Sequence, residues 1–205
     1  MELFETYLPD LVELKNEPFY DRGILPTEAF AFISYCKKLN IECIIESGTA
    51  FGQSCYLFAK YLGIKVYTID IIGPYGREAQ NIAHSRCRDL PVEFLEGNSN
   101  EILPKLIDEL SNKSIAVFID GPKGQGAINL KDRIWNYESV KMVGIHDLIG
   151  ENITGQFSSA NNSLFINTYQ DILDSISLSA PWVENPKQTM KEKFPFGQGI
   201  CIWHK

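Results

Sequence analysis

Five polar side chains, four of them acidic, each come at the end of a short apolar run of the sequence. They are Glu46, Asp70, Asn98, Asp120 and Asp147. Carboxylate and amide oxygens accept hydrogen bonds from the hydroxyls and amines of a ligand, and they also coordinate cations. Five unrelated surface turns would not be expected to repeat this placement. The pattern therefore indicates one polar site assembled from five separate turns.

The first turn has the glycine spacing of a ligand-binding loop. Its sequence is Glu46-Ser47-Gly48-Thr49-Ala50-Phe51-Gly52-Gln53-Ser54, and it leads directly into a segment with helical periodicity. Glycines permit positive φ and let a ligand approach the backbone, and the first N–H groups of a helix are free to donate. The spacing differs from both G-x-G-x-x-G and G-x-x-x-x-G-K-[ST]. A tight strand-to-helix turn without a ligand is the alternative interpretation.

The later turns add groups of different chemistry. Asp70 follows the glycines by roughly 20 residues, where a carboxylate commonly holds ribose hydroxyls. Asn98 and Ser99 suit a ligand contact, although a helix cap explains them equally well. The fourth turn, 120–124, places an acid beside two glycines and Lys123, which is unusual for a simple turn. The fifth ends in the pair His146-Asp147.

Alternating strands and helices must position these turns. Apolar, β-branched runs predict strands at 41–45, 64–69, 92–95, 115–119, 142–145 and 199–203. Helical periodicity predicts helices at 27–39 (with Thr27 as its cap), 54–62, 77–90, 98–110, 127–135 and 164–176, the last after a polar loop at 150–162. This alternation is typical of an α/β fold built from parallel βαβ units, in which ligands bind at the carboxyl ends of the strands.

In this order and spacing, the motifs resemble those of the class I S-adenosylmethionine-dependent methyltransferases. Among these, the catechol/caffeoyl-CoA-type O-methyltransferases and their bacterial relatives are the most similar. Their first motif, an acid, any residue and then G-x-x-x-G-x-S, is matched by Glu46, Gly48, Gly52 and Ser54. Their third-strand motif and their F-[IL]-D-x-x-K segment are similar to Gly97-Asn98-Ser99 with 101–106 and to Phe118-Ile119-Asp120-x-x-Lys123. The resemblance covers about residues 27 to 147 and the final strand.

The resemblance implies a Rossmann-like, doubly wound, mostly parallel seven-stranded sheet with helices on both faces and an antiparallel last strand. It implies S-adenosylmethionine as the cofactor, bound by Glu46, Gly48, Thr49, Ala50, Gly52, Ser54, Asp70, Asn98, Ser99 and Asp120. It also implies methyl transfer to a small-molecule acceptor, at oxygen, beside Asp120, Lys123 and His146. His146, or Lys123 with a lowered pKa, could serve as the base.

Two departures from the family pattern concern the site directly. Asn98 replaces the usual aspartate beside the adenine. His146-Asp147 replaces the Asp-Asn pair of the metal-dependent members. Asp120, His146 and Asp147 could still hold a divalent ion, although an imidazole ligand favours a softer metal than Mg²⁺. Metal-free relatives also carry His-Asp at this place.

The chain is expected to form one domain over residues 1–205. A helical lead-in (1–40) precedes the cofactor-binding core (41–147), and an acceptor-side segment (148–205) follows. Aromatic side chains near the start could line an acceptor pocket, pack in the core or form a homodimer contact; they are Phe4, Tyr7, Phe19 and Tyr20. Aromatic residues near the end are expected in the core; they are Trp182, Phe194, Phe196 and Trp203.

Composition limits the partners. The chain has 19 Lys and Arg against 26 Asp and Glu, a net charge of −7, which disfavours broad binding to nucleic acid or anionic lipid. Its acidic start is unlike a signal peptide, and no apolar stretch approaches the roughly 18 residues of a membrane span. Five scattered cysteines without a C-x-x-C pair favour reduced, buried thiols and a cytoplasmic protein. An NAD-dependent enzyme and a non-catalytic binding or assembly module are the alternatives.

Overall fold

The computed structural model describes residues 6–7, 9–10, 13–14, 16–17, 23–73, 75–147 and 200–205 of the 205-residue chain. Strands and helices alternate along these residues as the periodicity predicts. In chain order they are α2 (Pro26–Lys38), β1 (Cys43–Ser47), α3 (Gln53–Leu62), β2 (Lys65–Asp70), α4 (Gly76–Arg86), β3 (Val92–Glu96), α5 (Ser99–Glu109), β4 (Ile115–Ile119), α6 (Gln125–Ile134), β5 (Val140–His146) and β6 (Ile200–His204).

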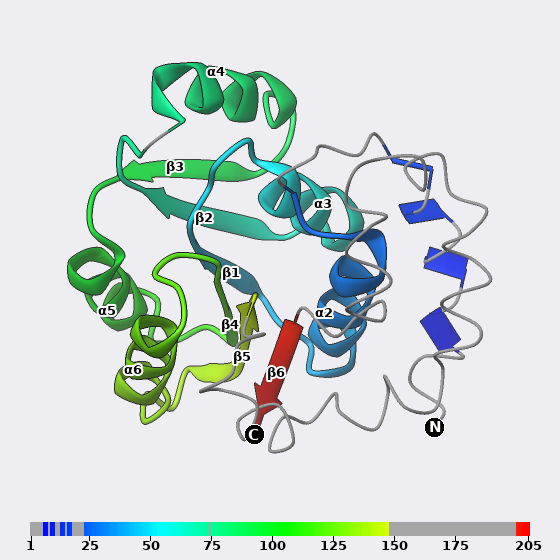
Figure 1. The fold of residues 1–205 in the computed structure, drawn as a ribbon. Helices are drawn as coiled ribbons and strands as arrows, with labels where there is room; N and C mark the ends of the chain where they lie inside the picture. Colours follow the sequence, from blue (N-terminus) through cyan, green and yellow to red (C-terminus); the bar gives the residue numbers. More distant parts are fainter. Residues whose placement is uncertain are drawn as a thin grey trace.

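The strands form one sheet in the order β3-β2-β1-β4-β5-β6 (Figure 1). The first five strands are parallel, and β6 is antiparallel to β5. This confirms the doubly wound, mostly parallel sheet with an antiparallel last strand. The described residues supply six strands where seven were expected. The predicted loop at 150–162 and helix at 164–176 lie outside the described residues.

Helices cover both faces of the sheet, as predicted (Figure 1). On one face, α2 and α3 bury a cluster that includes Phe30, Phe32 and Phe58. On the other face, α5 and α6 bury a second cluster around Leu103 and Ile107. Side chains of β1 alternate between the two clusters, and every residue of β4 is buried, as expected of a central strand with two covered faces.

Several boundaries differ from the sequence prediction. β1 runs from Cys43 to Ser47 and not over 41–45, so Glu46 lies inside the strand and is fully buried. The strand can extend through this acid because buried hydroxyl groups bind its carboxylate. α2 begins at Pro26, so the prediction of Thr27 as its cap was wrong; the N–H of Leu25 is instead bound by the carboxylate of Glu28, 2.8 Å away. α4 ends at Arg86, four residues earlier than expected.

The core accounts for the cysteines and for part of the aromatic residues. All five cysteines are free and buried, which confirms the prediction. Trp203 is buried in the second cluster, as expected, and Tyr7 packs against the first cluster. The other aromatic candidates, Phe4, Phe19, Tyr20, Trp182, Phe194 and Phe196, lie outside the described residues. Among the described residues, no helix combines the length and apolar character that a membrane span requires.

Candidate functional site

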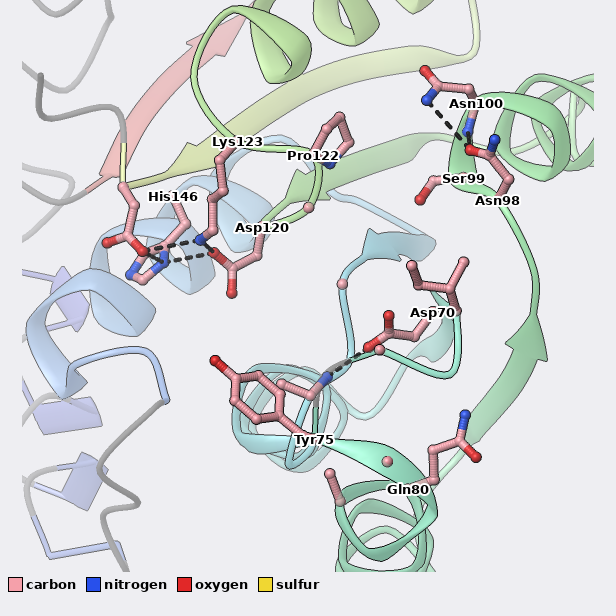
Figure 2. Close-up of a pocket in the computed structure, with 18 residues that line it drawn as sticks. Asp70, Tyr75, Gln80, Asn98, Ser99, Asn100, Asp120, Pro122, Lys123 and His146 are labelled. Carbon is pink, nitrogen blue, oxygen red and sulfur yellow. Dashed lines mark hydrogen bonds and ion pairs between the residues drawn. The ribbon is translucent and has the colours of Figure 1, made fainter.

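A pocket of about 500 Å³ opens at the carboxyl ends of the parallel strands. It lies where the chain order of the strands reverses between β1 and β4, the usual position of ligands in doubly wound sheets. Nine predicted site residues line it: Gly48, Ala50, Asp70, Asn98, Ser99, Asp120, Lys123, His146 and Asp147. Asp120, Lys123 and His146 gather on one side of the pocket, and Asn98 and Ser99 lie on the other (Figure 2).

The loop between β1 and α3 is held in place by Asp70. One oxygen of this carboxylate, Oδ2, accepts hydrogen bonds from the backbone N–H groups of Thr49 and Ala50, each 2.9 Å long. Both bonds go to the same oxygen, and a carboxylate can accept at both of its oxygens. Asp70 can therefore orient the loop and still accept hydrogen bonds from a ligand in the pocket.

The two glycines of this loop have different reasons to be glycine. Gly48 has a φ of +99°, and a Cβ atom there would lie 2.9 Å from the backbone nitrogen of Gly121. Its missing side chain lets the β1 and β4 turns meet at the pocket. Gly52 has a φ of +72°, and a Cβ atom there would lie 2.8 Å from the Cβ of Ala83 in α4. Gly52 therefore serves the packing of α4 against the start of α3.

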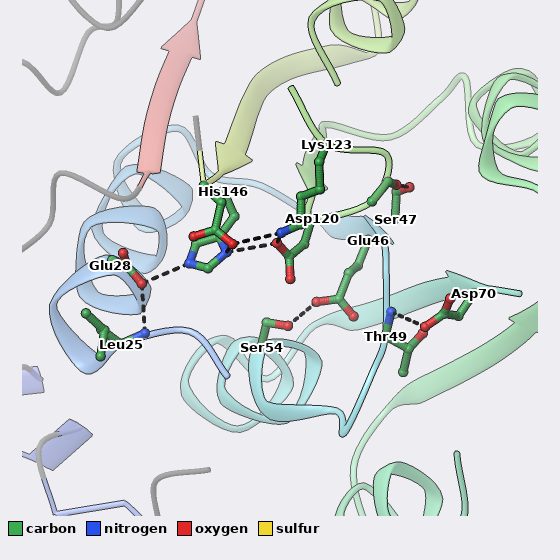
Figure 3. Close-up of polar contacts among 12 residues, drawn as sticks. Leu25, Glu28, Glu46, Ser47, Thr49, Ser54, Asp70, Asp120, Lys123 and His146 are labelled. Carbon is green, nitrogen blue, oxygen red and sulfur yellow. Dashed lines mark hydrogen bonds and ion pairs between the residues drawn. The ribbon is translucent and has the colours of Figure 1, made fainter. Parts of the chain in front are cut away.

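Glu46 lies beneath the loop. The hydroxyl of Ser54 donates a hydrogen bond to one oxygen of the Glu46 carboxyl group (Figure 3). The hydroxyl of Thr68 donates to the other oxygen, and the hydroxyl of Thr49 lies 2.6 Å from that of Thr68. Burial raises the pKa of Glu46 to about 8, against the smaller opposing effect of these hydrogen bonds. Glu46, Thr49 and Ser54 thus belong to one hydrogen-bonded network beneath the loop. Like Gly52, these predicted cofactor residues are not among those that line the pocket.

A cluster of charged side chains forms the other side of the pocket (Figure 3). Nδ1 of His146 lies 2.8 Å from Oδ1 of Asp120, and Nε2 of His146 lies 3.0 Å from Oε2 of Glu28. The Nζ atom of Lys123 donates to Oδ1 of Asp120 and to Oδ2 of Asp147, the latter 2.9 Å away. The ends of β4 and β5 and the start of α2 contribute to this cluster.

Sequence reasoning missed Glu28. An acid at the third position of a helix is sufficiently explained by its bond to the N–H of Leu25. Nothing in its local pattern indicates that the same oxygen, Oε2, also bonds to a histidine 118 residues later. A long-range contact of this kind depends on the packing of α2 beside β5, which periodicity alone does not specify.

Solved structures share this architecture. One, assigned as a caffeoyl-CoA O-methyltransferase from Staphylococcus aureus, is 18% identical, covers 99% of each chain and has a TM-score of 0.51. The O-methyltransferase TomG from Streptomyces achromogenes, in complex with SAM, is 16% identical over 85% of this chain and 78% of its own, with a TM-score of 0.51. An O-methyltransferase from Bacillus cereus, in complex with SAH, has 16% identity, coverages of 85% and 80%, and a TM-score of 0.50.

The chain has the fold of these three O-methyltransferase structures. At identities of 18% or below, the likeness is one of fold. No protein-family model matches the sequence, and neither does any curated protein. The likeness therefore does not assign a reaction to this chain, and its function must be inferred from its own residues.

The charges of the cluster bear on its acid–base chemistry. Burial alone lowers the pKa of His146, but Glu28 and Asp120 outweigh it and hold that pKa well above the ordinary value of 6.5. Burial also lowers the pKa of Lys123, yet Asp120 and Asp147 raise it overall. The hypothesis of a Lys123 base with a lowered pKa is therefore wrong for this arrangement. Burial raises the pKa of each aspartate, but the neighbouring cations lower both overall.

The predicted metal site can be tested against the same contacts. One ligand atom each from Asp120, His146 and Asp147 comes together within 4.8 Å, as expected for a set of metal ligands. However, the ammonium of Lys123 bonds to both aspartates, and both ring nitrogens of His146 face carboxylates. As arranged, these residues do not fit a divalent ion.

The pocket itself fits the predicted cofactor. Gly48 leaves its wall open where a side chain would clash, and Asp70 offers a carboxylate beside the loop. Asn98 and Ser99 supply polar groups across the pocket from Lys123. Asn98 also caps α5, since its side chain accepts a hydrogen bond from the N–H of Asn100. Asn98 can therefore cap α5 and line the pocket at the same time.

Proposed function

We propose that this protein is an S-adenosylmethionine-dependent methyltransferase that modifies an oxygen atom of a small-molecule acceptor. The observation that carries the proposal is the pocket at the carboxyl ends of the strands. It has a loop fixed by Asp70 on one side and the Lys123–Asp120–His146 cluster on the other. The names of the O-methyltransferases with this fold support the choice of oxygen over nitrogen.

Gly48, Ala50, Asp70, Asn98, Ser99 and Asp120 are the residues proposed to contact the cofactor. The carboxylate of Asp70 would accept hydrogen bonds from the ribose hydroxyls. Asn98 and Ser99 would lie beside the adenine, and the side chains of Glu46, Thr49 and Ser54 would hold the loop from below. When bound, the cofactor supplies a methyl group on a positively charged sulfur.

Lys123 is the residue best placed to contact the acceptor. An ammonium group has three N–H donors, and Asp120 and Asp147 accept from Lys123. A donor that remains can bond to the acceptor oxygen, hold it in line with the methyl group and lower the pKa of the acceptor hydroxyl, which releases its proton to solvent as the methyl group transfers. His146 has both ring nitrogens engaged by carboxylates and therefore acts as a positioning residue for Asp120.

Composition supports the proposed partners and location. A net charge of −7 supports a small-molecule acceptor over a polyanion, and the five free, buried cysteines support a cytoplasmic location. A homodimer stays a prediction.

Calorimetric titration with S-adenosylhomocysteine and, separately, with NAD⁺ tests the proposal. We expect micromolar binding of the first and none of the second. Binding of NAD⁺ alone would favour the dehydrogenase alternative. Binding of S-adenosylhomocysteine without transfer from S-adenosylmethionine to any of a broad panel of hydroxyl acceptors would favour a non-catalytic binding module. Lys123→Ala should abolish transfer and retain cofactor affinity.

A further inference from the structure

We propose that the ammonium of Lys123 is a built-in cation that takes the place of a divalent metal ion between Asp120 and Asp147. The role of this ammonium in the reaction rests on the proposed function, whereas its contacts with the two aspartates do not. The site would then work without added metal, and removal of the lysine would create a metal site that the native chain lacks.

Lys123 occupies the position that a bridging metal ion would need. Its Nζ atom bonds to Oδ1 of Asp120 and lies 2.9 Å from Oδ2 of Asp147. Divalent ions bind carboxylate oxygens at about 2.0 to 2.6 Å. An ion that bridged these two oxygens would need the space that the ammonium occupies.

Both ring nitrogens of His146 already have partners. Nδ1 lies 2.8 Å from the carboxylate of Asp120, and Nε2 lies 3.0 Å from that of Glu28. A ring nitrogen engaged in such a contact is not available to bind a metal ion, which removes the third ligand of the set.

The charge of Lys123 also opposes a metal ion. Its ammonium is shared by Asp120 and Asp147 and offsets part of their negative charge. An added divalent ion would meet this cation at close range, and the repulsion opposes its binding. Without Lys123, the two carboxylates lose the cation that they share, although Oδ1 of Asp120 keeps its contact with His146, and two neighbouring carboxylates attract a divalent ion.

Manganese binding by the 205-residue chain tests the proposal without any measurement of turnover. Mn²⁺ would be titrated, with detection by electron paramagnetic resonance, into the native chain and into Lys123→Met, which keeps much of the side-chain volume. We expect Lys123→Met to bind Mn²⁺ at least about tenfold more tightly than the native chain. Lys123→Ala is the second variant, should the methionine side chain itself block the ion.

Two controls locate the effect. Lys65→Met also removes one positive charge from an ion pair, with Glu93 at 3.0 Å, and should leave Mn²⁺ affinity at the native level. Adding Asp147→Asn to Lys123→Met should abolish the new binding. The proposal would be overturned if neither Lys123 variant bound Mn²⁺ more tightly than the native chain does.

Cofactor binding is measured separately, so the two proposals can fail independently. We expect the native chain to bind S-adenosylhomocysteine equally well with and without EDTA. If it binds none under either condition, the proposed function fails while the Mn²⁺ comparison still decides the role of Lys123. If EDTA abolishes binding, the built-in cation is contradicted.

Discussion

Oε2 of Glu28 lies 3.0 Å from Nε2 of His146, although 118 residues separate the two in the chain. Both side chains are buried, with exposed fractions of 5% and 8%. The contact ties the first turn of α2 to the end of β5, so the helix that precedes the sheet helps to build the charged side of the pocket.

Glu28→Gln should lower the pKa of His146. The pKa of His146 is raised above 6.5 because Glu28 and Asp120 outweigh the effect of burial, and the change removes one of these two charges. A raised histidine pKa stabilises the fold fully below pH 6.5, and this contribution is lost as pH rises through the folded pKa. The variant should lose this stabilisation at a lower pH than the native chain. NMR titration of the three histidines measures the change in the pKa of His146.

The matched control is Glu78→Gln. Glu78 is also an acid in the first turn of a helix, but its side chain is exposed. Glu78→Gln should leave the pKa of His146 unchanged. If Glu28→Gln also leaves the pKa of His146 unchanged, the Glu28–His146 contact has no electrostatic role.

Glu46→Gln should make stability less dependent on pH. Burial raises the pKa of Glu46 from 4.5 to about 8, so its contribution to stability is complete below pH 4.5 and is lost as pH rises through 8. Relative to the native chain, the variant should gain up to about 4 kcal/mol of unfolding free energy between pH 5 and pH 9. Urea denaturation at several pH values measures this, with the exposed Glu101→Gln as the control. A difference between variant and native chain that does not change with pH would contradict the account.

Gly48→Val should weaken S-adenosylhomocysteine binding by about 100-fold or more. Any Cβ atom at this position would lie 2.9 Å from the nitrogen of Gly121, and a positive φ is unfavourable for valine. Gly63→Ala is the control, because Gly63 has a similar positive φ of +65° but open space around its missing Cβ. Calorimetry on both variants, after thermal melts confirm folding, decides between a local and a general effect. Native affinity in Gly48→Val would rule out this turn as the cofactor site.

Asp70→Asn should weaken S-adenosylhomocysteine binding by about tenfold or more, since hydrogen bonds to a charged group contribute roughly 1.5 to 3 kcal/mol. The variant loses the charged partner of the Thr49 and Ala50 N–H groups and would hold ribose hydroxyls less strongly. Asp89→Asn, which removes an exposed acid, is the control. Equal affinities of the two variants for S-adenosylhomocysteine would show that Asp70 acts on neither the loop nor the ligand.

Periodicity predicted the fold well because the sheet is built from strongly patterned segments. The residues of β4 are apolar and buried on both faces, and α5 has the expected cap at Asn98. The boundary of β1 was missed because Glu46 is polar and resembles the end of a strand by type. Its burial depends on hydroxyl groups from β2 and α3, which only the folded structure brings together.

The sequence predicted which residues form the candidate site better than it predicted the contacts between them. The sequence placed Asp70, Asp120, Lys123 and His146 at one edge of the sheet, and the structure brings them to one pocket. The sequence did not indicate that Lys123 pairs with two aspartates. This pairing raises the pKa of Lys123, whereas a catalytic base would need a lowered pKa. Such pairings depend on turn geometry and on side-chain direction, and neither is encoded in residue spacing.

We propose that the pocket between Gly48, Asp70 and Lys123 binds S-adenosylmethionine. A crystal structure of the protein grown with saturating S-adenosylhomocysteine would test this directly. We expect the nucleoside in this pocket, with its ribose hydroxyls within hydrogen-bond distance of Asp70 and its sulfur on the side of Asp120 and Lys123. A ligand bound elsewhere, or a pocket that stays empty at saturation, would contradict it.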